Sequence, residues 1–362
     1  MSKAEFFGRR RLARLLDGMG ELGLDVVVLL GGAGAGPRNQ RLTGTTSGMS
    51  LVVPLEGSPT LFVYSVDYYG ARDESWLPVV SLESRAQAWE RVAAHVNSFL
   101  GGGGRVGVEL PRLSHLDHQA LTSRVHGELV DVSGSLVPKV FHGLYPEEVE
   151  LQRKACRLAD LGCQAARDSM DVGVRETEVA AEANYAMMRA GAETLSFQTI
   201  VSTGPRSAYS HGWPTARRLG RGEFMLVDLG PVVGGYAADE TRTYVLGEDP
   251  EKRRMLEAVD AAVQAVLDHV EPGASCAELD RVSRKVLGEH GFGDYPYSLG
   301  HPLNGFPQPA LSKNSGHTLK PGMVFTVEPG IYVPGFGGVR LEENVVVTED
   351  GYVKLTESPR LD

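Results

Sequence analysis

Residues 227–230 read Val-Asp-Leu-Gly, and residues 327–330, one hundred positions later, read Val-Glu-Pro-Gly. A second carboxylate follows each stretch, Asp239 after the first and Glu342 after the second. Two acidic segments of the same form indicate one structural unit that is used twice. Together the two copies offer four carboxylates to a single site.

The repeat extends upstream of the carboxylates at the same offset, which is far longer than the period of a solenoid. We predict two copies of a helix-helix-strand-hairpin unit, packed about a pseudo-two-fold axis. Coincidence among common residues such as Gly and Glu is the alternative, but agreement at both helical and hairpin positions makes it weaker. The matching positions are Gly173, Glu178, Val179, Met187 and Gly191, echoed by Gly273, Glu278, Leu279, Leu287 and Gly291.

The composition is that of a soluble globular protein. The chain has 362 residues, 42% hydrophobic and 23% charged, which is long enough for two domains with cores of their own. A net charge of -10 and the absence of a long basic run argue against a nucleic-acid or acidic-membrane partner. The apolar stretch at residues 26–30 is too short for a signal-peptide core or a membrane span. We therefore expect a cytoplasmic protein.

The three cysteines, Cys156, Cys163 and Cys276, have no CxxC spacing and cannot all pair. We interpret them as small buried apolar residues and assign them no chemistry.

The first part of the chain predicts a small α/β domain. An amphipathic helix at residues 5–22 leads into an apolar strand at residues 25–30. Further strands are expected at residues 50–53, 60–64 and 105–109.

The pattern changes near residue 146. Pro146 at a first helical position, followed by two glutamates, predicts a long helix, and Pro250 begins its counterpart. In that counterpart we expect a buried apolar stripe, formed by Met255, Val259, Val263, Val266 and Val270. We divide the chain into domains at residues 1–139 and 140–362.

A hairpin is expected between residues 224–228 and residues 236–243. If it is centred on residues 233–234, Asp228 lies directly opposite Asp239, with Cβ atoms about 5 Å apart. Such a pair repels by roughly 4 kcal/mol at an effective dielectric near 20. Only cations or protons make the pair tolerable.

The second hairpin repeats this logic around Gly335. It sets Glu328 opposite Glu342 and leaves Arg340 on the same face, two residues before Glu342. Both hairpins together gather four anionic side chains.

His301, in the sequence Leu-Gly-His, is the natural nitrogen ligand to accompany the carboxylates. Oxygen-rich ligation with one imidazole suits manganese, iron(II), cobalt or zinc, and four carboxylates are enough to bridge two ions. Arg340 and Thr241 would orient these ligands. Taken singly, each residue has a simpler reading as a turn residue, a solvated histidine or a surface ion pair. The duplication favours a dinuclear metal site.

Five segments carry a family resemblance, and each contains one of the residues discussed above as a metal ligand. They read Val-Asp-Leu-Gly at 227–230, Asp-Glu-Thr-Arg-Thr at 239–243, Gly-His at 300–301, Val-Glu-Pro-Gly-Ile-Tyr at 327–332 and Gly-Val-Arg-Leu-Glu at 338–342. In combination they resemble the pita-bread metallopeptidases, the family of Xaa-Pro dipeptidase, aminopeptidase P and methionine aminopeptidase.

The resemblance is strong over about residues 146–362. Residues 1–139 resemble the family's creatinase-type N-terminal domain more loosely, through Asn39 and Leu-Thr-Gly at 42–44. It implies an α+β pita-bread catalytic domain with an internal repeat, preceded by a smaller α/β domain. The N-terminal domain favours the proline-directed branch over methionine aminopeptidase.

The resemblance also implies roles for single residues. Two divalent ions are expected, manganese or cobalt first, with zinc and iron as alternatives. Asp239 and Glu342 would bridge them, and Glu328 would also act as general acid-base. His211 stands where the family keeps a substrate-facing histidine, the alternative being a solvated loop residue. A homodimer is also implied. The five implied ligands are Asp228, Asp239, His301, Glu328 and Glu342.

Two departures from the family pattern concern the substrate. Gln308 stands seven positions after His301, where the family carries a second histidine, and an amide can donate to an oxyanion but supplies no charged imidazolium. Prolidases carry a carboxylate-binding arginine shortly beyond, where this chain has Ser312 and Lys313. Lys313 would substitute as a point charge, which is not equivalent at a bidentate site. Strict dipeptidase specificity is therefore in doubt.

The leading hypothesis is metal-dependent hydrolysis of the Xaa-Pro bond in dipeptides or short peptides. One alternative keeps the metals but makes the chain a hydrolase or lyase of a small non-peptide metabolite. A substrate panel separates these two. The other alternative is a non-catalytic binding module, which would hold less than one ion per chain.

Overall fold

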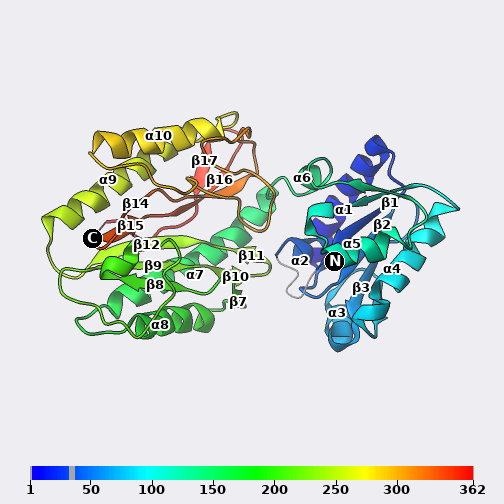
Figure 1. The fold of residues 1–362 in the computed structure, drawn as a ribbon, viewed down its shortest axis with the longest axis horizontal. Helices are drawn as coiled ribbons and strands as arrows, with labels where there is room; N and C mark the ends of the chain where they lie inside the picture. The colour runs from blue at the N-terminus through cyan, green and yellow to red at the C-terminus, as the bar shows by residue number, and fades with distance from the viewer. Residues whose placement is uncertain (1, 32–36, 362) are drawn as a thin grey trace. The chain divides into compact units, whose positions relative to one another are not determined.

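The computed structural model describes residues 2–31 and 37–361. They form two compact units (Figure 1). The first unit comprises Met1–His142 and Asn304–Pro307, and the second comprises Gly143–Leu303 and Gln308–Asp362. Among the described helices, none combines the length and the apolar character needed to cross a bilayer.

The first unit contains a six-stranded sheet in the order β4-β3-β2-β1-β5-β6. Only β2 runs antiparallel to its neighbours, so the sheet is mostly parallel, as expected for an α/β domain. The strands are β1 Val26–Leu30, β2 Ser50–Pro54, β3 Thr60–Tyr64, β4 Val79–Leu82, β5 Arg105–Val108 and β6 Glu128–Asp131.

Helices cover this sheet. The first of them begins where the Ser2 hydroxyl accepts a hydrogen bond from the Glu5 amide, and it ends at Gly23 with φ 61°. The helices are α1 Lys3–Leu22, α2 Pro37–Thr43, α3 Tyr68–Glu74, α4 Arg85–Leu100, α5 His115–Thr122 and α6 Val137–Val140, with 3₁₀ turns at Ser65–Asp67 and Leu110–Arg112.

The second unit contains the predicted duplication. Its first copy consists of a 3₁₀ turn at Pro146–Glu148, α7 Val149–Asp168, α8 Glu176–Arg189, β7 Thr194–Leu195, β8 Ile200–Thr203, a 3₁₀ turn at Gly204–Ala208, β9 Phe224–Leu229, β10 Pro231–Val233, β11 Tyr236–Ala237 and β12 Glu240–Val245. Its second copy consists of α9 Pro250–Leu267, α10 Cys276–Glu289, β13 Val324–Val327, β14 Gly330–Val333, β15 Gly337–Arg340, β16 Glu343–Val347 and β17 Tyr352–Lys354.

Equivalent positions in the two copies also share their backbone geometry. Gly173 and Gly273 have φ angles of 87° and 88°. Each donates its amide to the carbonyl of a leucine, Leu219 or Leu319, at 2.8 Å. The offset of one hundred is therefore structural and not a coincidence of composition.

The strands of the second unit lie between two helix pairs, α7 with α8 and α9 with α10 (Figure 1). The predicted stripe on α9 is buried and forms part of the core beneath it. Phe325 of β13 and Val345 of β16 belong to the same core. Burial of the helix stripe thus fixes the strands that carry the acidic residues.

The first hairpin differs in register from the prediction. Asp228 pairs with Thr241, and Val233 pairs with Tyr236, so the turn is centred on Gly234 and Gly235. Both glycines have positive φ angles, 57° and 81°, as the favoured two-residue hairpin turn requires. The prediction that Asp228 lies directly opposite Asp239 is wrong.

The second hairpin has the predicted register. Val327 pairs with Glu343, and Gly330 pairs with Arg340. Between these two ladders the same register places Glu328 opposite Glu342, with the turn at Gly335.

Candidate metal centre

The five predicted ligands line one cavity of about 700 Å³. One carboxylate lies next to the end of a strand, and three lie in the breaks between strands. Asp228 is in β9, Asp239 lies between β11 and β12, Glu328 lies between β13 and β14, Glu342 lies between β15 and β16, and His301 lies in the segment after α10.

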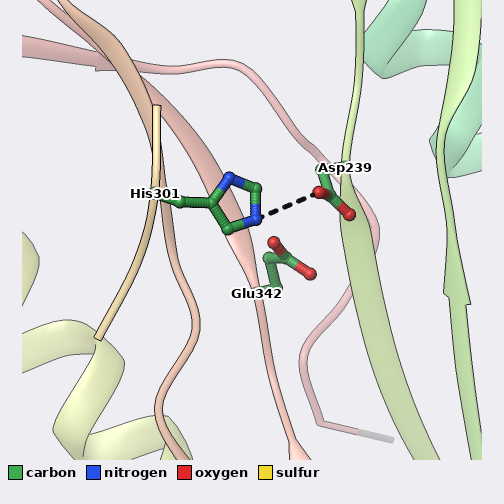
Figure 2. Close-up of side chains that lie close together, drawn as sticks. All are labelled: Asp239, His301 and Glu342. Atoms are coloured by element: carbon green, nitrogen blue, oxygen red, sulfur yellow. Dashed lines mark ion pairs between the residues drawn. The ribbon is translucent and has the colours of Figure 1, made fainter. Parts of the chain in front are cut away.

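His301 is at the centre of the cluster. Its Nε2 is 3.4 Å from Asp239 Oδ2 and 3.3 Å from Glu328 Oε1. Asp239, His301 and Glu342 each offer a ligand atom within 4.8 Å of the others. Figure 2 shows these three side chains converging from three separate segments.

Two carboxylate oxygens in this cavity are buried without a hydrogen-bond partner. They are Asp228 Oδ1 and Glu342 Oε1. The other oxygen of each carboxylate is held, since Arg340 Nη2 donates to Asp228 Oδ2 at 2.6 Å and Thr241 Oγ1 donates to Glu342 Oε2 at 2.7 Å. A buried oxygen without a partner is costly, and a cation removes that cost. Oxygen donors with one imidazole fit manganese, cobalt, iron(II) or zinc.

Burial raises the pKa of three of the carboxylic acids in the metal-free protein. Burial raises the pKa of Asp239 to about 7, with the charges of Asp228 and Glu328 adding to it against the hydrogen bond from His301. Burial likewise raises the pKa of Glu328, and burial with the charge of Asp239 raises the pKa of Glu342 well above its usual range.

The pKa of the His301 imidazole is affected by burial and by its acidic neighbours in opposite directions. Burial lowers the pKa of His301, but the hydrogen bond to Asp239 and the charge of Glu328 outweigh it and raise the pKa to about 10. Raised pKa values favour protons on these groups, and protons are the species that a bound cation would displace.

Arg340 connects several parts of the cavity. It is 4% exposed, and besides Asp228 its Nε donates to Thr241 Oγ1 at 3.0 Å. Its Nη1 donates to the Tyr332 hydroxyl at 3.1 Å and to the Ser210 carbonyl at 3.3 Å. Arg340 and Thr241 are thus placed where they would orient acidic ligands.

His211 also lines the cavity. Its ring stacks on Trp213, with centroids 5.8 Å apart and an interplanar angle of 15°. Sequence reasoning missed Trp213 and Phe197, which line the same cavity.

Gln308 and Lys313 do not belong to the residues that line this cavity. Lys313 forms an ion pair with Asp294, and both side chains are about half exposed. Gln308 follows Asn304–Pro307, the segment that belongs to the first unit. The structure therefore brings His211 to the cavity, but neither of these two residues.

One wall of the cavity is a segment that sequence reasoning missed, residues 295–298. Arg284 of α10 holds it, donating to the carbonyls of Tyr295 at 2.6 Å and Tyr297 at 2.7 Å. The remaining donors of the guanidinium bind Asp280 and Asp294. Tyr297 in turn meets Tyr332 edge to face, with ring centroids 5.3 Å apart.

Comparison with known proteins identifies the class. Residues 150–349 match Metallopeptidase family M24, and residues 11–139 match the Creatinase/Prolidase N-terminal domain. The chain belongs to metallopeptidase family M24, which confirms the predicted resemblance and fold class.

Individual relatives match over nearly the whole chain. The Xaa-Pro dipeptidase of Pyrococcus furiosus is 34% identical over 97% of this chain and 99% of its own length. The prolidase structure from Pyrococcus furiosus superimposes with a TM-score of 0.84 at 32% identity, covering 95% of this chain and 100% of that one. The X-Pro aminopeptidase structure from Thermotoga maritima gives 0.88 at 27% identity, covering 97% and 98%.

Proposed function

We propose that this metallopeptidase hydrolyses the peptide bond before proline in dipeptides and short peptides. The observation that carries the proposal is the convergence of four carboxylates and one imidazole in a single cavity, with two buried carboxylate oxygens left unpartnered. Near full-length similarity to a protein named Xaa-Pro dipeptidase supports the choice of bond.

In this proposal Asp228, Asp239, His301, Glu328 and Glu342 hold two divalent ions, manganese or cobalt before zinc or iron. Such ions, when bound, supply a water of lowered pKa and polarise the carbonyl of the scissile bond.

Glu328 moves the proton. Thr326 Oγ1 donates to Glu328 Oε1 at 2.9 Å, which fixes the carboxylate and leaves its second oxygen for proton transfer. Burial raises the pKa of Glu328 in the metal-free protein, and its carboxylate form is the one that general-base catalysis would use. It takes a proton from the attacking water and passes it to the leaving nitrogen of proline.

His211 binds the substrate carbonyl by a hydrogen bond, with its ring held by the stack on Trp213. We do not carry Gln308 or Lys313 into this mechanism, because neither lines the cavity.

The cavity also bears on peptide length. Among its described lining residues, Arg340 is the only lysine or arginine, and its guanidinium is bonded to Asp228. A dipeptide's terminal carboxylate gains no free guanidinium from this cavity. We therefore propose that longer Xaa-Pro peptides are substrates as well as dipeptides.

The test is metal-dependent cleavage by the purified chain. After chelation and addition of manganese or cobalt, we expect release of leucine from Leu-Pro and from Leu-Pro-Gly, and none from a Glu328→Gln variant. Turnover of a non-peptide amide but of neither peptide would favour the small-metabolite alternative. Binding of less than one ion per chain at saturation would favour the binding module.

We also propose a homodimer, a cytoplasmic location and the domain division at residues 1–139 and 140–362. Light scattering after size-exclusion chromatography tests the dimer. Limited proteolysis between the two units tests the division.

A further inference from the structure

Asp239 lies in a gap of the strand ladder. β11 ends at Ala237 and β12 begins at Glu240, so regular strand pairing does not fix its backbone. Instead its amide donates to Asn344 Oδ1 at 3.1 Å, and its carbonyl accepts from Asn344 Nδ2. A carboxamide carries a donor and an acceptor side by side, so this one side chain replaces both missing ladder bonds.

Asn344 is itself held rigidly. It is fully buried in β16, pairs with Thr326 of β13, and takes part in the bonds that join β16 to the following segment. The main-chain amide of Asn344 donates to Thr356 Oγ1 at 3.2 Å, and its main-chain carbonyl accepts from the Leu355 amide at 2.8 Å. The side chain of Asn344 therefore presents a fixed template to Asp239.

The two copies of the repeat support each other's acidic residues. In the second copy, Arg340 binds Asp228 and Asn344 binds the backbone of Asp239. In the first copy, Thr241 binds Glu342 of the second. Residues 340, 342 and 344 are thus each hydrogen-bonded to a residue of the first copy.

We propose that Asn344 is a positioning residue for ion binding. By fixing the backbone of Asp239 it aims that carboxylate at His301 and Glu342, without touching substrate or ion. This inference rests on the proposed metal site.

The test is manganese affinity in the full chain. Asn344→Ala should weaken binding of Mn²⁺ to the metal-free protein by about 10- to 100-fold, the range for residues that orient metal ligands. Free Mn²⁺ is measured by electron paramagnetic resonance during the titration. At saturating Mn²⁺ the kcat of the variant should return to within about threefold of wild type, because the reacting groups are intact.

The matched control is Asn184→Ala. Asn184 is a partly buried asparagine of α8 that accepts a hydrogen bond from Thr199 Oγ1 at 2.6 Å, and neither residue is among those that line the cavity. Its Mn²⁺ affinity should stay within about twofold of wild type. An equal loss in this control would overturn the inference.

A second variant, Asn344→Asp, keeps the size of the side chain and an acceptor for the Asp239 amide but loses the donor to the carbonyl. It should also bind Mn²⁺ more weakly, and it decides the matter if Asn344→Ala does not fold. Unchanged affinity in either folded variant, or failure of both to fold, overturns the inference. Wild-type protein that binds no Mn²⁺ would instead overturn the proposed function.

Discussion

Replacement of Arg340 by methionine is expected to destabilise the metal-free protein strongly. Methionine is similar in length but apolar, so the substitution leaves the Asp228 carboxylate buried without its charged partner. Arg340 and Asp228 are 4% and 7% exposed, and their Nη2 and Oδ2 atoms are 2.6 Å apart. Water therefore cannot take over the role of the guanidinium.

The magnitude follows from the geometry. Two charges about 4 Å apart at an effective dielectric near 20 attract by about 4 kcal/mol. Removal of one partner from a buried pair costs about 3–5 kcal/mol, in agreement. For a domain of roughly 200 residues, 4 kcal/mol corresponds to about 8–16 °C in melting temperature.

The assay is urea unfolding of the chelated protein, with Arg340→Met, Asp228→Asn and the double variant compared. The double variant should be more stable than Arg340→Met, because a neutral amide replaces the unpaired carboxylate. As control, Arg72→Met removes an exposed pair with Asp73 and should change stability by less than about 1 kcal/mol. A cost below about 1 kcal/mol for Arg340→Met, or no recovery in the double variant, would refute the reasoning.

Four further outcomes are expected. Mn²⁺ affinity should rise from pH 5 to pH 8, because protons compete with the cation for Asp239, whose pKa is raised to about 7. The protonated form of Asp239 stabilises the metal-free fold at low pH, and this stabilisation is lost as pH rises through 7. Calorimetry in two buffers measures the protons released on binding. His211→Ala should lower kcat about 10²- to 10³-fold at unchanged metal content, as loss of a donor to the oxyanion does, checked by steady-state kinetics with metal analysis. Lys313→Met should leave kcat/KM for Leu-Pro within about twofold, because Lys313 pairs with Asp294 outside the cavity, whereas a tenfold loss would restore its predicted substrate role. Met255→Ala, in the α9 core, should cost about 2–5 kcal/mol in urea unfolding.

The fold could be predicted where apolar pattern and turn chemistry agree. The strand expected at residues 60–64 has those bounds, and the helix begun by Pro250 is present. The first hairpin was misplaced because Gly234 and Gly235 allow two turn centres one position apart. The pattern that decides the register is the glycine pair itself, since both residues take positive φ angles. In the second hairpin the strands on either side of Gly335 pair in the predicted register, with the turn centred on that residue.

The ligand cluster could be predicted because charge repulsion between carboxylates demands a cation or protons, whatever the precise register. Residues that act through the backbone could not be found in this way. Asn344 binds main-chain atoms of Asp239, which lies 105 positions earlier, and the type of its side chain does not indicate which residue it binds. The family pattern predicts a substrate role for Lys313, and in the structure this residue forms an ion pair with Asp294 and is not among the residues that line the cavity.

The wall formed by residues 295–298 has a consequence for divergence among relatives. Arg284 holds this wall from α10, through main-chain carbonyls that any amino acid provides. Tyr297 can therefore be exchanged without loss of those bonds, while the carboxylates on the strands keep their places. The residues that would set peptide specificity and the residues that would carry catalysis lie on separate parts of the same pocket. A new peptide preference can therefore arise without a change in the catalytic residues.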